Sequence, residues 1–155
     1  MTALGPASAD TKYDSIKISF DDPSWIQRAM AIEQIATHYT AGAQAPNEMR
    51  VAEDIFRLAL YDSEVTVRRV LAESLKRAAF LPSDIVLALA RDTIEVARPV
   101  LLASPVLSEL DLIGIAASAS PLHRQAILAR DGLSTPVSKE LTEANCRPAE
   151  RRLAS

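Results

Sequence analysis

The chain has 155 residues, 48% of them hydrophobic and 24% charged, which suits one globular domain with a hydrophobic core and excludes wholesale disorder. Aromatic residues are scarce at 5%, and the apolar residues are mainly Ala, Leu, Val and Ile, a mixture that favours helix packing over a β-sandwich. The formal net charge of -3 provides no general basic excess for phosphates, which argues against a duplex-binding domain.

Residues 1–22 are expected to form a flexible arm ahead of the folded domain. Within it, Ile16, Ile18 and Phe20 alternate with polar residues. A period of two predicts an extended segment with one apolar edge. We expect this arm to lie over the first helix, with docking elsewhere as a strand-like peptide as the alternative.

Apolar residues at spacings of three and four predict a series of α-helices over residues 23–145. Asp, Ser and Pro residues mark their starts, and a glycine closes the first of them. A charged tail is expected at 146–155. The helices are expected between Asp22 and Gly42, Pro46 and Asp62, Ser63 and Leu81, and Ser83 and Ala90, and then at about 94–103, 108–118, 121–130 and 134–144.

Three local features refine this prediction. Residues 85–90 are apolar on every side, so a short helix buried between neighbours is expected there. Pro99 predicts a kink or a late helix start. Gly114 either permits close packing or weakens its helix by about 1 kcal/mol. The predicted interior contains Ile55, Val70, Leu71, Leu75, Ile85, Leu89, Leu101, Ile113 and Ile127.

The later segments resemble one another. Arg68, Arg98 and Arg124 lie 30 and 26 residues apart, and each is followed by an apolar run and then a Leu–Ser or Leu–Pro–Ser helix start. That length accommodates two short helices and two turns. A single pair of this size cannot bury its apolar face, whereas stacked pairs share a continuous core. The prediction is an all-α fold, a short α-solenoid of HEAT-like antiparallel helix pairs.

Two stretches carry a family resemblance. The run from Asp62 to Leu75 is similar to a HEAT repeat, with its acidic residue, Val–Arg step and later leucine. Residues 87–97, 99–101 and 104–108 resemble the bacterial domain-of-unknown-function family 2336, and 126–134 continue the likeness. The resemblance covers roughly residues 24–145. It implies a HEAT-like helical array and supplies no catalytic residues.

Motifs that would indicate chemistry are missing from the sequence. Only four glycines occur, too few for a phosphate-binding loop, and no Gly-x-Ser-x-Gly motif is present. Cys146, His38 and His123 are too widely separated in sequence to suggest a zinc site. His123 is expected at the surface or at a helix cap, and His38 on the polar side of the first helix. We therefore expect a protein that is not an enzyme and has no catalytic, cofactor or metal site.

Six residues are candidates for contact with a partner. Trp25 either plugs the open end of the solenoid or anchors a partner, since Trp is enriched at hot spots. Arg69, Lys76 and Arg77 share one helical face, where they could meet an acidic peptide or nucleic acid, or pair with Glu73. Val137 and Leu141 are expected to be left uncovered by the helices at the C-terminal end. A second copy of the chain or further sequence would then cover them. The six residues are Trp25, Arg69, Lys76, Arg77, Val137 and Leu141.

These observations predict a protein-interaction module, a scaffold or adaptor that presents a helical-repeat surface to a protein partner. The partner is of unknown identity, and a homodimer is one form of it. The alternative function is a HEAT-like nucleic-acid-binding or base-repair protein, which the acidic balance and single Trp disfavour. A lone cysteine fits a reducing compartment, and no membrane-length apolar stretch occurs, so a cytoplasmic location without membrane contact is expected.

Overall fold

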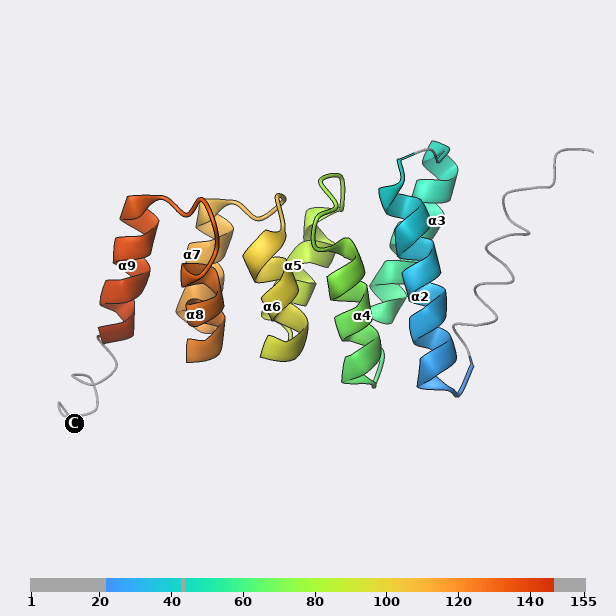
Figure 1. Cartoon of the computed structure of the whole chain (residues 1–155), viewed down its shortest axis with the longest axis horizontal. Coiled ribbons are helices and arrows are strands. Elements are labelled where there is room, and N and C mark those ends of the chain that lie inside the picture. The colour runs from blue at the N-terminus through green and yellow to red at the C-terminus, as the bar shows by residue number, and fades with distance from the viewer. Residues whose placement is uncertain (1–21, 43, 147–155) are drawn as a thin grey trace, which may run out of the picture. The chain divides into compact units, whose positions relative to one another are not determined.

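The computed structural model describes residues 22–42 and 44–146, and every regular element in this part of the chain is an α-helix (Figure 1). The all-α prediction is therefore confirmed. The predicted arm, with Ile16, Ile18 and Phe20, lies outside the described residues apart from Asp22, and so does the tail from Arg147 onward. The helices fall into two compact units, with the boundary between Leu75 and Lys76.

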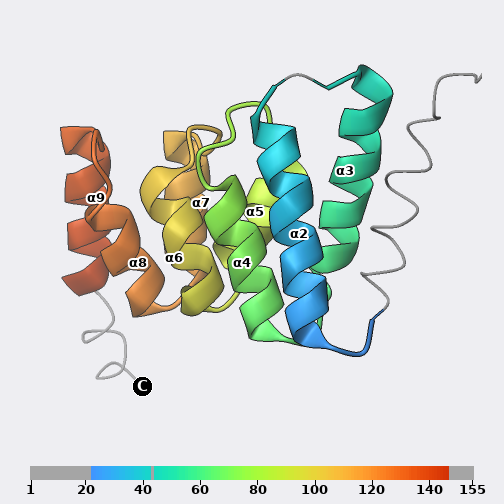
Figure 2. The same cartoon turned by 45° about the vertical axis from the view of Figure 1, so that its right-hand side comes forward.

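The first unit contains three helices: α2 (Trp25–Thr40), α3 (Pro46–Ala59) and α4 (Val65–Leu75). α2 lies beside α4 (Figure 2). α3 packs against both α2 and α4. Gly42 follows α2 with a φ of 73°, a left-handed conformation that ends a helix at little cost for glycine. Pro46 is the first residue of α3, where its missing N–H group has no helical partner to lose.

An aromatic pair joins α2 to α3 in the core of this unit. The Tyr39 and Phe56 rings meet edge to face, with centroids 5.3 Å apart at an interplanar angle of 83°. The Tyr39 hydroxyl donates a hydrogen bond to Glu53 Oε1 at 3.0 Å. Burial, together with this hydrogen bond to a carboxylate, raises the pKa of Tyr39. The pair therefore fixes how α3 is rotated against α2.

The second unit contains α5 (Ser83–Arg91), α6 (Ile94–Ala103), α7 (Glu109–Ser118), α8 (Pro121–Leu128) and α9 (Thr135–Cys146). α6 packs on α8, while α7 contacts α5 and α9, so the five helices form two layers. Ser108 caps α7 with a complete capping box, because its hydroxyl accepts from the Asp111 N–H and the Asp111 carboxylate accepts from the Ser108 N–H. The predicted start at Ser108 is thus explained by its side chain.

The structure corrects four local predictions. α4 ends at Leu75 and does not continue toward Leu81; Ala78 and Leu81 are instead buried in the loop that follows. α6 starts at Ile94, so Pro99 lies inside the helix and causes no late start. Ala88 is exposed, so α5 is not buried on every side. Of the predicted interior, Val70 and Ile113 are only partly buried, because neighbours Leu71, Leu112 and Ile115 occupy the inward positions.

Candidate partner-binding surface

The predicted basic face is not formed by a single helix. Arg69 is exposed on α4, but Lys76 and Arg77 follow the end of that helix, in a turn that opens the second unit. Residues on one helix share a face only while the helix continues. The expectation that all three cations lie on one helical face was therefore wrong.

The predicted apolar face at the C-terminal end is also wrong. Val137 and Leu141 are 5% and 2% exposed, because α9 packs these side chains against α7 and α8. Four-residue spacing places both on one face of α9, and that face points into the second unit. Neither side chain can anchor a partner while α9 stays packed.

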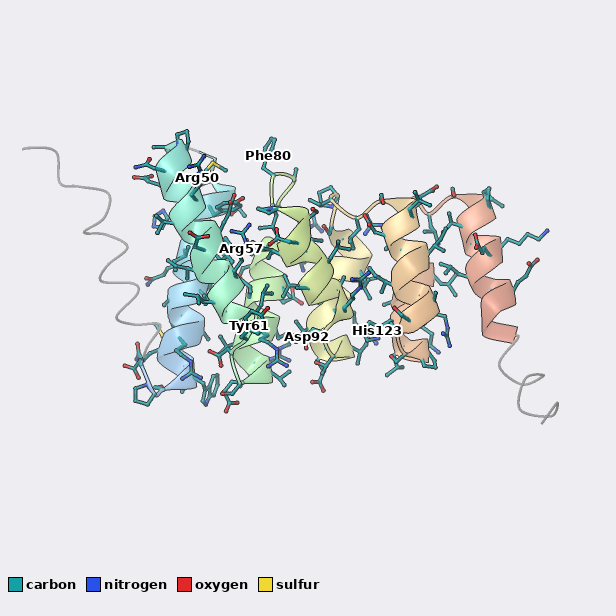
Figure 3. The ribbon with its side chains drawn as sticks, turned by 180° about the vertical axis from the view of Figure 1, so that it is seen from behind. Arg50, Arg57, Tyr61, Phe80, Asp92 and His123 are labelled. Carbon is teal, nitrogen blue, oxygen red and sulfur yellow. The ribbon has the colours of Figure 1, made fainter. Side chains whose placement is uncertain are left out.

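A different row of exposed side chains runs along α3 and into the turn after it. Arg50, Asp54, Arg57, Leu58 and Tyr61 recur at helical spacing, on the side opposite the buried residues of that helix. Figure 3 shows Arg50, Arg57 and Tyr61 following one another along the helix and into the turn beyond it. Leu58 is 58% exposed and Tyr61 is 89% exposed. We call these five residues the α3 stripe.

The α3 stripe combines charge with apolar area. Arg57 Nη1 donates to Asp54 Oδ1 at 3.1 Å across one helical turn, and both side chains remain in solvent. Such a pair contributes little to stability, so its groups can exchange partners cheaply. Arg and Tyr are the residue types that most often dominate protein interfaces. The stripe is chemically suited to a partner that offers carboxylates around an apolar centre.

A buried ion pair fixes the turn that ends the stripe. Arg28 of α2 forms a two-pronged contact with Asp62, Nε to Oδ2 at 2.7 Å and Nη2 to Oδ1 at 3.0 Å. The Arg28 and Asp62 side chains are 14% and 4% exposed. Arg68 Nη1 donates to the Asp62 carbonyl oxygen at 2.6 Å, so two arginines hold the residue directly after Tyr61.

The ionisation of Asp62 depends on these contacts. Burial alone would raise the pKa of Asp62, but hydrogen bonds from Arg28 and from the Glu64 N–H outweigh it and hold the pKa below its ordinary value. Asp62 is therefore charged in the folded protein. Because Arg28 and Arg68 both bind Asp62, the backbone next to Tyr61 is held in a fixed position.

A second exposed apolar cluster begins α2. Trp25 is 43% exposed, and Ile26 and Met30 are each 50% exposed. Ile26 and Met30 are four residues apart and share a face, and Trp25 borders it in the first turn. We call these three residues the α2 patch. In the described residues Trp25 is neither a buried plug nor fully solvated.

His123 lies at a helix start, as predicted, but its side chain is buried. It lies in the first turn of α8, as a cap-region histidine would, but it is 6% exposed and so is not at the surface (Figure 3). Its Nε2 lies 2.8 Å from the Asp92 carbonyl oxygen and its Nδ1 lies 2.7 Å from Ser120 Oγ. Because a carbonyl can only accept, Nε2 carries the proton. His123 therefore ties the start of α8 to the turn between α5 and α6.

In the described part of the chain, no group of three or more His, Cys, Asp or Glu side chains is arranged to hold a metal ion. None of the helices in residues 22–42 and 44–146 has the length and apolar character needed to cross a membrane.

The described residues form an all-α protein of short packed helices, with a row of charged and apolar side chains exposed along α3. Residues 96–155 match the family described as an uncharacterised protein conserved in bacteria (DUF2336). The matched family is the one that the sequence resembles, but the match begins at residue 96, whereas the likeness was expected from about residue 24. No curated protein and no solved structure matches the chain.

Sequence reasoning missed the α3 stripe and the Arg28–Asp62 pair. Arg50, Asp54 and Leu58 do lie four residues apart, a signal for one helical face that was available. The exposure of Leu58 and Tyr61 was not available, because an apolar residue at helical spacing is ordinarily assigned to the core. The partners Arg28 and Asp62 are 34 residues apart, and no local pattern links them.

Proposed function

We propose that this chain is a non-catalytic protein-interaction module, a scaffold or adaptor that binds a protein partner through the α3 stripe. The observation that carries the proposal is one exposed row in which Arg50 and Arg57 of α3 are followed by Leu58 and by Tyr61 of the next turn. A monomeric protein normally keeps such residues scattered, and an ordered row of them marks an interaction site.

The chemistry of the stripe indicates the kind of partner. Arg50 and Arg57 are two guanidinium groups on one face, and each can bind a carboxylate through two parallel hydrogen bonds. Leu58 and Tyr61 offer apolar area beside them. We therefore propose an acidic partner surface with an apolar residue at its centre, which displaces Asp54 from Arg57 on binding.

We further propose that the helix pairs continue one another as a HEAT-like α-solenoid. Within each unit, helices alternate between two layers and each contacts the next helix of its own layer, the contact pattern of stacked pairs. Solenoids use an extended helical surface to bind peptides or folded proteins. The single cysteine supports a reducing location, which we propose to be the cytoplasm.

The test compares capture of partners by wild-type and variant chains from a native-host lysate, followed by binding of the purified candidate. Tyr61→Ala and Arg50→Glu should each abolish or weaken capture of the same protein. Arg98→Glu is the matched control, because Arg98 is also an exposed helix arginine but lies on α6.

Each variant must keep the wild-type helical circular dichroism and melting temperature. A partner retained equally by Tyr61→Ala, Arg50→Glu and the wild-type chain would show that the α3 stripe is not the binding surface. Loss of the partner with Arg98→Glu alone would place the surface on α6.

A further inference from the structure

The side chains of the α3 stripe are arranged symmetrically along the helix. Asp54 and Arg57 are three residues apart at the centre of the stripe. Arg50 lies four residues before this pair, and Tyr61 lies four residues after it. Both pairs of residues therefore share one midpoint. Figure 3 shows Arg50, Arg57 and Tyr61 in this order along the helix and the turn after it.

This symmetry makes the stripe complementary to itself when two copies of α3 run antiparallel. In a twofold-symmetric contact, residue i of one copy meets residue j of the other, and residue j meets residue i. With the axis at the shared midpoint, Arg57 of each copy meets Asp54 of the other. Arg50 of each copy meets Tyr61 of the other, which suits a cation–π contact.

The charges favour the antiparallel arrangement over a parallel one. In parallel register each arginine would face the same arginine of the second copy, and Asp54 would face Asp54, so the two copies would repel each other. Within one chain Arg57 Nη1 lies 3.1 Å from Asp54 Oδ1, and the two side chains are 40% and 75% exposed. Such an exposed pair contributes little to stability. The antiparallel contact exchanges it for two equivalent pairs between the copies, so both groups keep a counter-charge.

Leu58 supplies the apolar part of the contact. It is 58% exposed and directly follows Arg57 in α3. In the antiparallel arrangement the two Leu58 residues lie on the same flank of the interface, about 7.5 Å apart along the helix axes at a rise of about 1.5 Å per residue. Leucine side chains at this separation can meet, and association then removes both from water.

We propose that the α3 stripe binds a second copy of the same chain, with the two α3 helices antiparallel about a twofold axis between Asp54 and Arg57. This inference rests on the proposed function, because it names the partner of the same stripe. A second copy has the chemistry that the stripe requires, since it offers the Asp54 carboxylate with Leu58 nearby. The contact lies in the first unit and does not involve Val137 or Leu141.

Light scattering on the purified full chain measures this association directly. The molar mass of the wild-type chain should rise from the monomer value of 16.8 kDa toward twice that value as the concentration increases. Asp54→Arg and Arg57→Asp should each remain monomeric, because each places like charges opposite one another. An equimolar mixture of these two variants should dimerise, because two arginines of one chain then meet two aspartates of the other.

Two further variants complete the test, and circular dichroism checks that every variant keeps its helices. Tyr61→Ala alters no charge and should also weaken the dimer, while Arg98→Glu on α6 is the matched control and should dimerise like the wild type. A dimer that survives both single charge reversals, or a mixture of them that stays monomeric, would overturn the proposal.

A wild-type chain that is monomeric at every concentration would also overturn it. In that case a different protein captured by the wild-type chain and lost with Tyr61→Ala would still support the proposed function, so the two proposals can fail separately.

Discussion

At the scale of single residues, the first unit is stabilised by arginine side chains that bind a residue distant in sequence. Arg28 connects α2 to Asp62, and Arg68 donates to the carbonyl oxygen of that same residue. A buried charge that loses its partner is costly, since the protein interior solvates it poorly. These residues therefore hold the turn between α3 and α4 in place, and with it Tyr61.

Asp62→Asn should lower the free energy of unfolding at pH 7 by about 2 kcal/mol, because it leaves the part-buried Arg28 without its counter-charge. The folded pKa of Asp62 is lowered, so its contribution is complete above the ordinary value of 3.8 and is lost as the pH falls through the folded value. Urea unfolding at several pH values should show the difference between variant and wild type shrinking in acid. Asp54→Asn removes the exposed pair and should change stability by less than about 0.5 kcal/mol; an equal loss in both variants would contradict the assignment.

At the scale of elements, the glycines have two different roles. Two of them have a left-handed backbone that requires glycine, and one lies inside a helix that it weakens. Gly42 and Gly132 have φ values of 73° and 77°, which side-chain-bearing residues adopt only with strain. Gly114 is exposed inside α7, and a Cβ built on it meets no atom within 4 Å. Of the two interpretations drawn from the sequence, the structure supports weakening of the helix at Gly114 and excludes close packing there.

Gly114→Ala should raise the free energy of unfolding by about 1 kcal/mol, because alanine has the higher helix propensity and the added methyl group fits without a clash. Gly132→Ala should lower it by about 1 kcal/mol, because its φ is left-handed. Thermal unfolding followed by circular dichroism measures both. A lower melting temperature for Gly114→Ala would show that α7 needs glycine at this position.

At the scale of the whole molecule, burial decides which predicted surfaces can meet a partner. Val137 and Leu141 are inside the second unit, while the α3 stripe and the α2 patch of the first unit face solvent. The homodimer expected through the C-terminal end thus loses its two proposed anchors. The net charge of -3 is also a property of the whole chain, and it bears on whether the chain binds nucleic acid.

Val137→Asp should lower the free energy of unfolding by more than about 3 kcal/mol, since it buries an unpaired carboxylate. Lys139→Asp, two residues away with its side chain 76% exposed, should have little effect. Denaturant unfolding and light scattering should be measured together. A Val137→Asp variant of wild-type stability but reduced molar mass would show that this residue lies in an interface after all.

The net charge predicts that the chain does not bind duplex DNA tightly at physiological salt. A gel-shift titration with random-sequence duplex should show no complex at submicromolar protein. A shift that weakens steeply as salt increases would instead support nucleic-acid binding as the function, with Arg69 on α4 and Arg77 as the first residues to replace.

The sequence by itself determined where most helices lie, since the signals for a helix are local. Ser108 caps α7, and α6 occupies the predicted residues 94–103, because capping bonds and i, i+4 contacts involve close neighbours. Only the tertiary structure decided which apolar faces are covered. Leu141 is buried and Leu58 is exposed, although both lie at helical spacing, because burial depends on helices that are distant in sequence and meet only after folding.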